Sequence, residues 1–251
     1  MKNRVKRILQ KTLGFNNYLK IFARFKVNTL KHDSKEGDFF VFMKLLKDEG
    51  TILDIGANLG IMTWHLLSNF KKAEIWAFEP IPDNLAVLRA TTADIAQDRL
   101  KIFDKALGDE KGKLKMVLPR VEDVKMQGLS HVVHESITEF NEGDFYEVDV
   151  EKLDNLVDSD LQISGIKLDV ENFEYFVLKG GQEMIQKNKP IIYSELWDNE
   201  NRYKCFEFLE SLGYETHFRN GSGLKPLKGN SYEGQNFFFI PKESEVYQEF
   251  S

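Results

Sequence analysis

One stretch, Leu53–Gly60, constrains the fold more than any other part of the sequence. It follows an apolar run, turns on two glycines and leads directly into a segment with helical periodicity, which is typical of the first strand, loop and helix of an open α/β sheet. From residue 38 onward short apolar runs alternate with helical patterns, and this alternation predicts a mostly parallel sheet with crossover helices. The predicted strands are residues 51–55, 74–78, 100–103, 163–170, 191–196, 214–218 and 236–240, and the predicted helices are residues 39–46, 60–70, 84–95, 173–186 and 202–212.

Three segments interrupt this alternation. Residues 107–118 alternate around a turn at 109–112, which predicts a β-hairpin. Residues 119–146 are irregular and rich in His, Glu, Gly and Ser, so we predict a long loop of the kind that binds substrates. The Gly- and Asn-rich turn at residues 220–234 is a second segment where specificity could reside.

The loop after the first predicted strand indicates a cofactor site. A dinucleotide fold needs the spacing G-x-G-x-x-G, whereas here Gly56 and Gly60 flank Asn58, so the spacing argues against NAD. Asp54 precedes the turn, and a carboxylate there suits a ligand with an ammonium group, such as S-adenosylmethionine, better than a pyrophosphate. Glu79 ends the second strand, where a carboxylate can accept both hydroxyls of a ribose. The predicted cofactor-binding residues are Asp54, Gly56, Asn58, Gly60 and Glu79, with Asp104, Lys105 and Ala106 as contacts to the adenine base.

Further short motifs follow in a definite order. They are Asp54–Gly60, Ala77–Pro80 with Asn84 and Leu88, Lys105–Gly108, Lys152–Asp154, Ile166–Glu171 with Glu174, Leu178–Gly181, and Pro190 with Glu195. Together they resemble the FkbM family of S-adenosylmethionine-dependent methyltransferases, over residues 52–241. The resemblance implies the class I methyltransferase Rossmann-like fold, an α/β fold whose seven-stranded, mostly parallel sheet has an antiparallel last strand, and methyl transfer to a hydroxyl oxygen. The chain departs from the family at Asn172, where glycine is usual, and we expect the turn to survive because Asn tolerates left-handed backbone.

Methyl transfer to a hydroxyl requires a group that removes its proton. Alternation places Lys167, Asp169 and Glu171 on one side of the fourth strand, with the two acids at its C-terminal end, where ligands bind in open α/β sheets. Glu195 lies at the same end of the next strand. The predicted catalytic residues are therefore Asp169 first, Glu195 second, and Glu171, whose alternative role is to cap the following helix.

Other side chains are weaker candidates. Asp169, Glu195 and Asp198–Asn199 could supply oxygen ligands to Mg²⁺, but the same acids act without a metal, so no metal site is predicted and Mg²⁺ stays an alternative. His131 and His134 are alternative bases or substrate contacts. Trp197 could line a pocket, and Cys205 is expected to be a buried hydrophobic residue.

Charge separates the chain into two parts. The net charge is −6, yet residues 1–31 contain nine Lys or Arg and no acid, which leaves −15 for the remainder. Apolar side chains interleave with these cations, so we predict one or two amphipathic helices, broken near Gly14, that either pack on the domain with a solvated basic face or lie on an anionic membrane surface. The predicted division is a basic helical extension at residues 1–48 and an S-adenosylmethionine-dependent methyltransferase domain at residues 49–251.

The composition limits the cellular compartment and the binding partners that we expect for this protein. There is one cysteine, no apolar run long enough to span a bilayer, and no signal-peptide pattern at the start of the chain, so we expect a cytoplasmic protein, with peripheral contact to the inner membrane surface as a hypothesis. The acidic body argues against nucleic acid as a partner. We expect a sugar, glycan or other small-molecule acceptor; the alternatives are an RNA methyltransferase, and a nucleotide-binding oxidoreductase or a cofactor-binding module without catalysis. The sequence predicts no oligomeric state.

Overall fold

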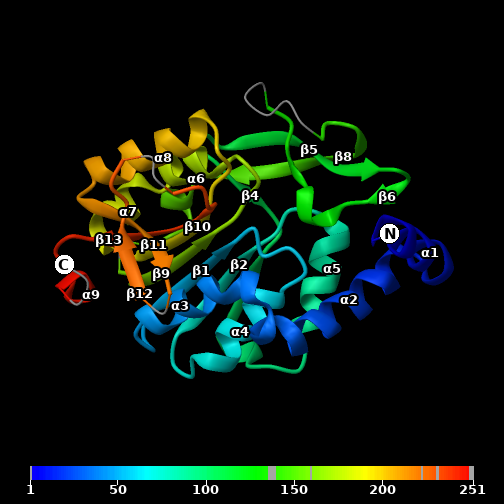
Figure 1. Cartoon of the computed structure of the whole chain (residues 1–251), viewed down its shortest axis with the longest axis horizontal. Coiled ribbons are helices and arrows are strands. Elements are labelled where there is room, and N and C mark those ends of the chain that lie inside the picture. The colour runs from blue at the N-terminus through cyan, green and yellow to red at the C-terminus, as the bar shows by residue number, and fades with distance from the viewer. Residues whose placement is uncertain (1, 135–139, 159, 222, 230–231, 249–251) are drawn as a thin grey trace.

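Figure 1 shows the computed structural model, which describes residues 2–134, 140–158, 160–221, 223–229 and 232–248. The α-helices are α1 (Lys2–Leu13), α2 (Phe15–Thr29), α3 (Gly37–Leu45), α4 (Ile61–Asn69), α5 (Pro82–Thr92), α6 (Glu174–Gly180), α7 (Gln182–Asn188), α8 (Glu200–Ser211) and α9 (Glu245–Gln248). The strands are β1 (Thr51–Ile55), β2 (Glu74–Phe78), β3 (Leu100–Phe103), β4 (Ala106–Leu107), β5 (Gly112–Val121), β6 (Val124–Lys125), β7 (His131–Val132), β8 (Gly143–Glu151), β9 (Ile163–Leu168), β10 (Ile191–Glu195), β11 (Tyr214–Asn220), β12 (Gly223–Pro226) and β13 (Asn236–Pro241). Short 3₁₀ turns are η1 (Leu30–His32), η2 (Ser34–Glu36), η3 (Gln97–Arg99), η4 (Gln127–Leu129) and η5 (Leu153–Asn155).

The main sheet has the strand order β12-β11-β13-β10-β9-β1-β2-β3. Its central strands are parallel, and β13 runs antiparallel to both β10 and β11. All seven predicted strands are present, and the antiparallel last strand is confirmed. The eighth strand, β12, pairs antiparallel with β11 and comes from within the predicted turn at residues 220–234, of which residues 222 and 230–231 lie outside the described residues.

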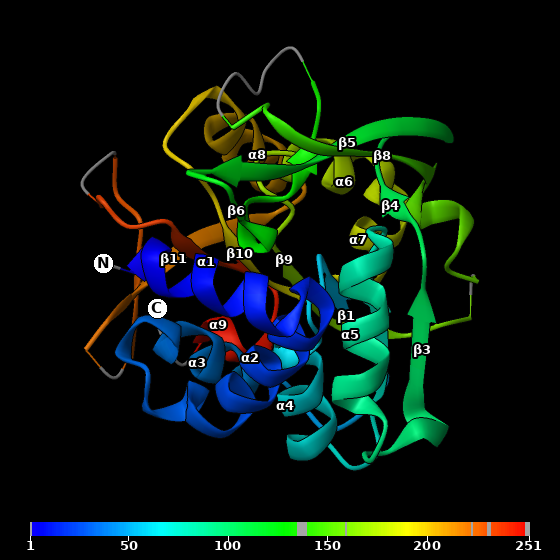
Figure 2. The same cartoon turned by 90° about the vertical axis from the view of Figure 1, so that its right-hand side faces the viewer.

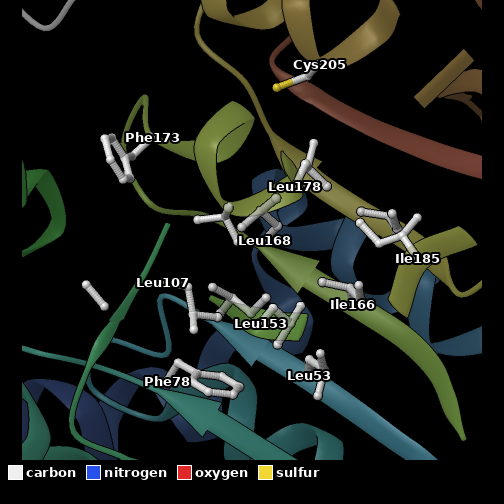
Figure 3. Packing of buried hydrophobic residues seen from close by; sticks show 14 of the residues in the cluster. Leu53, Phe78, Leu107, Leu153, Ile166, Leu168, Phe173, Leu178, Ile185 and Cys205 are labelled. Carbon is white, nitrogen blue, oxygen red and sulfur yellow. The ribbon is translucent and has the colours of Figure 1, made fainter. Parts of the chain in front are cut away.

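Helices cover both faces of the main sheet (Figure 1). Strand β1 is fully buried, and its side chains alternate between the two faces. Ile52 packs in the cluster with α3 and α4, whereas Leu53 and Ile55 pack in the larger cluster with α6, α7 and α8. Figure 3 shows part of this larger core, in which Leu53 and Ile166 come from neighbouring strands. Cys205 belongs to this core and is fully buried, as predicted.

A second sheet lies where the sequence predicted a hairpin and a loop, so the secondary structure predicted for both segments was wrong. Its order is β4-β8-β5-β6, with β7 also paired to β5. Strands β4 and β5 flank the predicted turn at 109–112 but do not pair with each other, because both pair with β8, β4 in parallel and β5 in antiparallel orientation. The predicted loop at 119–146 thus contains β6, η4, β7 and the start of β8, while its residues 135–139 lie outside the described residues.

The predicted helix at 173–186 divides into α6 and α7 at Gly181. A side chain at the neighbouring Gly180 would place its Cβ 1.9 Å from the Gly108 carbonyl oxygen, so the backbones of this helix end and of the segment after β4 approach too closely for any other residue. Helix α6 therefore ends in close backbone contact with the segment that follows β4.

The basic N-terminal segment forms two helices that meet at Gly14, as predicted. Gly14 has φ +75°, a conformation that favours glycine. Helix α2 buries Tyr18, Leu19 and Ala23 against α4 and α5. Figure 2 shows both helices lying across one side of the domain, with α1 near β6. In the described residues, no helix is both long and apolar enough to cross a membrane.

Candidate active site

A cavity of about 430 Å³ opens at the carboxyl ends of β1, β2, β9 and β10, the edge at which open α/β sheets bind ligands. The second sheet and η4 form its other wall. Its lining residues are Ile55, Gly56, Asn58, Phe78, Glu79, Pro80, Ile81, Asn84, Lys105, Ala106, Leu107, Met116, Gln127, Gly128, Leu129, Ser130, Val132, Asp169, Val170, Glu171, Phe173, Glu195, Trp197 and Gln235. The volume and the mixed lining are typical of a small-molecule site.

The loop after β1 is held tightly against the neighbouring strands. The backbone N–H groups of Gly56 and Ala57 both donate to the Phe78 carbonyl, at 3.1 and 2.9 Å. Gly56 has φ +77°, and a Cβ there would lie 1.8 Å from the Asp169 carbonyl oxygen. Gly60 also has positive φ and precedes α4. The glycines are therefore required by backbone conformation and by the close approach of β9.

Glu79 is held by three donors at one end of the cavity. Its carboxylate accepts from the backbone N–H of Asn58 at 2.9 Å and of Ile81 at 2.8 Å, and from Asn84 Nδ2 at 3.4 Å. Burial outweighs these hydrogen bonds and raises the pKa of Glu79 to about 7. A preorganised carboxyl group therefore borders the cavity, which Lys105 and Ala106 also line.

Lys167 lies beneath the loop and joins it to two acids. Its Nζ donates to the Gly56 carbonyl oxygen at 2.8 Å and lies 3.4 Å from Asp54 Oδ1 and 3.6 Å from Asp169 Oδ2. Burial lowers the pKa of Lys167, but the Asp54 and Asp169 carboxylates outweigh burial and raise it, so the side chain is charged. Asp54 is fully buried and also accepts from the Thr63 hydroxyl at 2.6 Å. Asp54 thus lies under the site and anchors Lys167, which in turn anchors Asp169.

Three acids line the cavity at the carboxyl ends of β9 and β10, where the sequence predicted the catalytic residues. Asp169, Glu171 and Glu195 all line it. Burial, followed by the charge of Asp169, raises the pKa of Glu195 to about 7 and that of Glu171 to about 10. Burial and the neighbouring charge therefore favour the protonated forms of both carboxyl groups, and the pKa is raised further for Glu171 than for Glu195.

The turn that presents Glu171 has an unusual backbone. Glu171 and Asn172 have φ of +53° and +75°, so both are left-handed. Glu174, which is buried, accepts from the backbone N–H of Val170 at 3.1 Å and of Asn172 at 3.2 Å. Asn199 donates to the Asn172 side-chain oxygen, so asparagine occupies the glycine-like position and gains a side-chain contact there. The expectation that the turn survives is confirmed.

The structure brings most of the predicted site residues together, but not all of them. Gly56, Asn58, Glu79, Lys105, Ala106, Asp169, Glu171 and Glu195 line the cavity, as does Trp197. Asp54 and Gly60 support the loop from below, and Asp104 is exposed outside the lining. His131 is buried with its ring nitrogens near Leu129 O and Asn141 Oδ1, and His134 packs on Phe173 and Phe176, so neither lines the cavity.

The alternative Mg²⁺ ligands have other contacts. Asp198 pairs with Arg202 at 3.3 Å, and Asn199 caps the N-terminus of α8. Within the described ranges, no group of three or more His, Cys, Asp or Glu side chains is arranged to hold a metal ion.

Sequence reasoning placed substrate binding in residues 119–146, which include Gln127 and Val132, but it singled out none of the residues that cover the cavity. Met116, Val132 and Gln127 reach it from the second sheet and η4, and Gln235 reaches it from the segment before β13. A signal existed for the sheet, because Tyr146, Val148 and Val150 alternate with the acidic residues 147, 149 and 151, as a half-buried strand requires. No local pattern marked Gln127 or Gln235.

The cavity wall offers acceptors that fit S-adenosylmethionine. Besides Glu79, the side-chain oxygens of Asn58 and Asn84 are buried without a hydrogen-bond partner. Unpartnered buried acceptors are costly, and a ligand with hydroxyl and ammonium donors would satisfy them. The residues present therefore fit the donor-rich part of that cofactor.

Comparisons with known proteins identify the family and the fold. The family model described as "Methyltransferase FkbM domain" matches residues 54–217. The 2-O-methyltransferase NoeI of Sinorhizobium fredii is 29% identical over 166 residues, which is 62% of this chain and 67% of that protein. The crystal structure of methyltransferase FkbM from Methylobacillus flagellatus superposes with a TM-score of 0.51 at 18% identity, covering 77% of this chain and 44% of that one. The chain thus spans less than half of that solved chain, and the likeness shows a shared fold.

Proposed function

Because the chain belongs to the FkbM methyltransferase domain family, we propose that it transfers a methyl group from S-adenosylmethionine to a hydroxyl oxygen of a sugar, glycan or other small acceptor. One observation carries this proposal. A single cavity is lined by Glu79, which follows β2, and by three acids at the carboxyl ends of β9 and β10. The name of the relative NoeI, a 2-O-methyltransferase, supports oxygen as the methylated atom.

S-adenosylmethionine, when bound, supplies an electrophilic methyl group. On the chain's side, Glu79, Asn58 and Asn84 would accept hydrogen bonds from the cofactor's hydroxyl and ammonium groups. Lys105 and Ala106 would border the adenine. Gln127 and Leu129 cover the cavity and would exclude water.

Glu195 is the proposed base. A general base works best with a pKa near the operating pH, and burial together with the Asp169 charge raises the pKa of Glu195 to about 7. Asp169, held by Lys167, would orient the acceptor hydroxyl. Glu171 is protonated at neutral pH because burial and neighbouring acids raise its pKa to about 10, so it would donate a hydrogen bond to an acceptor oxygen.

The proposed compartment is the cytoplasm. Cys205 is buried and forms no disulfide, so the fold does not depend on an oxidising environment.

Transfer of a labelled methyl group to a panel of hydroxylated sugars and glycans tests the proposal. We expect kcat/KM to rise with pH through about 7, as Glu195 loses its proton, and Glu195→Gln to lower kcat by about 10²–10⁴-fold and remove that rise. The exposed acid Glu200, changed to Gln, is the matched control and should leave the profile unchanged. Label appearing in RNA and in no hydroxylated small acceptor would overturn the proposed substrate class, and an unaltered pH profile in Glu195→Gln would overturn the assignment of the base.

A further inference from the structure

Helix α1 contacts the rest of the protein through its polar side. Asn3 Nδ2 donates to Glu122 Oε2 at 3.4 Å, and Arg7 lies 3.9 Å from Asp123. Gln10 makes two hydrogen bonds with the Lys125 backbone, at 3.0 and 3.1 Å. These three side chains follow one another at spacings of four and three residues, so they form one face of the helix.

The opposite face of α1 is apolar and exposed. Val5, Ile8, Leu9 and Leu13 repeat at helical spacing, and the exposed fractions of Val5 and Ile8 are 52% and 61%. A helix that packs on a soluble domain ordinarily buries its apolar face. Helix α1 does the opposite, because its polar face contacts the domain and its apolar face is exposed. One interpretation of the sequence was that both helices pack on the domain as a lid with a solvated basic face. That interpretation accounts for the packing of α2, but not for the exposed apolar face of α1.

Helix α2 also has exposed apolar residues. Ile21 and Phe25 lie one turn apart and are 57% and 62% exposed. Figure 2 shows α1 and α2 on the same side of the molecule. We call the six exposed residues the apolar strip; its members are Val5, Ile8, Leu9, Leu13, Ile21 and Phe25.

Exposed cations flank the apolar strip. Arg4 and Lys11 border it on α1, and Lys20 and Arg24 border it on α2. Residues 1–31 contain nine Lys or Arg and no acid, while the rest of the chain carries −15. A second copy of the chain is a poor occupant because two such segments facing each other would repel. An anionic lipid surface matches both the charge and the apolar residues.

We propose that α1 and the exposed side of α2 dock on an anionic phospholipid membrane, with the apolar strip in the boundary between headgroups and acyl chains and the flanking cations at lipid phosphates. This inference does not depend on methyl transfer. It places the protein on the membrane surface, because binding of this kind needs no spanning helix. Gln10, on the opposite face of α1, binds Lys125, and Gln127 two residues further on lines the cavity, so α1 lies between the docked face and the segment that leads to one wall of the candidate active site.

Co-sedimentation of the full chain with phosphatidylcholine vesicles, with and without phosphatidylglycerol, tests the proposal. We expect binding only to the anionic vesicles, weakening as salt is raised. Val5→Gln together with Ile8→Gln should weaken it by about tenfold or more, because two apolar side chains leave the boundary. Gln is a good helix former, so α1 should persist in this variant, and its circular dichroism and Tm confirm folding.

Two controls match the apolar change. Ile8→Leu keeps an apolar side chain and should bind like the wild type. Phe145→Gln replaces an exposed aromatic residue on the second sheet and should not affect binding. Failure of the wild type to bind anionic vesicles would overturn the proposal, as would full binding by the double Gln variant. A dimer that dissociates in the double Gln variant without any vesicle binding would show instead that a second copy covers the apolar strip.

Discussion

Replacing Lys167 by Met should destabilise the whole fold, although the residue does not line the cavity. The side chain is 3% exposed and is the cation beside Asp54, which is fully buried. Met has a similar length and no charge, so the variant removes the charge and the hydrogen bond to Gly56 while keeping much of the packing. The Thr63 hydroxyl would remain as a donor to Asp54.

The magnitude follows from what the substitution leaves behind. Removing one partner of a buried ion pair costs about 3–5 kcal/mol, since the other charge stays buried without compensation. The carboxylate of Asp169 is 33% exposed and can be hydrated by solvent, so most of the cost comes from Asp54. We therefore expect the free energy of unfolding to fall by about 4 kcal/mol.

Urea denaturation followed by tryptophan fluorescence measures this loss. The double variant Asp54→Asn with Lys167→Met should lose less than the sum of the two single variants, with a coupling of about 2 kcal/mol, because it leaves no buried charge. Lys204→Met, which breaks the exposed pair with Glu200, is the matched control and should change stability little, as exposed pairs are screened by water. A loss below about 1 kcal/mol for Lys167→Met, or strict additivity in the double variant, would refute the reasoning.

Two further predictions concern the loop and its support. Gly56→Ala should abolish binding of S-adenosylhomocysteine, because the new Cβ would lie 1.8 Å from the Asp169 carbonyl oxygen at φ +77°; calorimetry that finds unchanged affinity would contradict the role of this close approach. Burial raises the pKa of Glu174 from 4.5 to about 8, so the fold favours its protonated form, and the stability that it contributes is present below pH 4.5 and is lost as pH rises through about 8. In thermal melts across that range Glu174→Gln should lose less stability than the wild type, and parallel pH dependence in the two proteins would show that Glu174 is not the group responsible.

The parts of the fold that local sequence encodes were predictable. Strand β1 and its glycine loop occupy the positions expected from hydrophobic periodicity and motif spacing, and so do the acids at the ends of β2, β9 and β10. Each of these features depends on residues that are close in sequence. The edge of the sheet at which ligands bind could also be predicted, because in open α/β sheets it lies at the carboxyl ends of the parallel strands.

Pairing between distant segments was not predictable in the same way. The hairpin prediction for 107–118 recognised a strand, but its partner β8 begins more than twenty residues later, and loop closure over that distance leaves no local signal. The same limit applies to Gln127, which reaches the cavity through that second sheet.

Burial also changed the role of individual side chains. Asp54 was predicted to face a ligand ammonium group, yet it lies fully buried next to Lys167, because alternation along β1 directs it toward α4. Sequence periodicity likewise gave α1 an apolar face but not the direction in which that face points, since this depends on contacts with residues 122–125.

The most direct test of the proposed function is a calorimetric titration with S-adenosylhomocysteine, with NADH in parallel. The wild type should bind S-adenosylhomocysteine and not NADH. Glu79→Ala should weaken that binding by about tenfold or more, because it removes the carboxyl group proposed to accept hydrogen bonds from the cofactor. Glu74→Ala, at the half-buried start of the same strand and outside the cavity lining, should bind like the wild type. Binding of NADH in place of S-adenosylhomocysteine, or affinity unaffected by the loss of Glu79, would contradict the account.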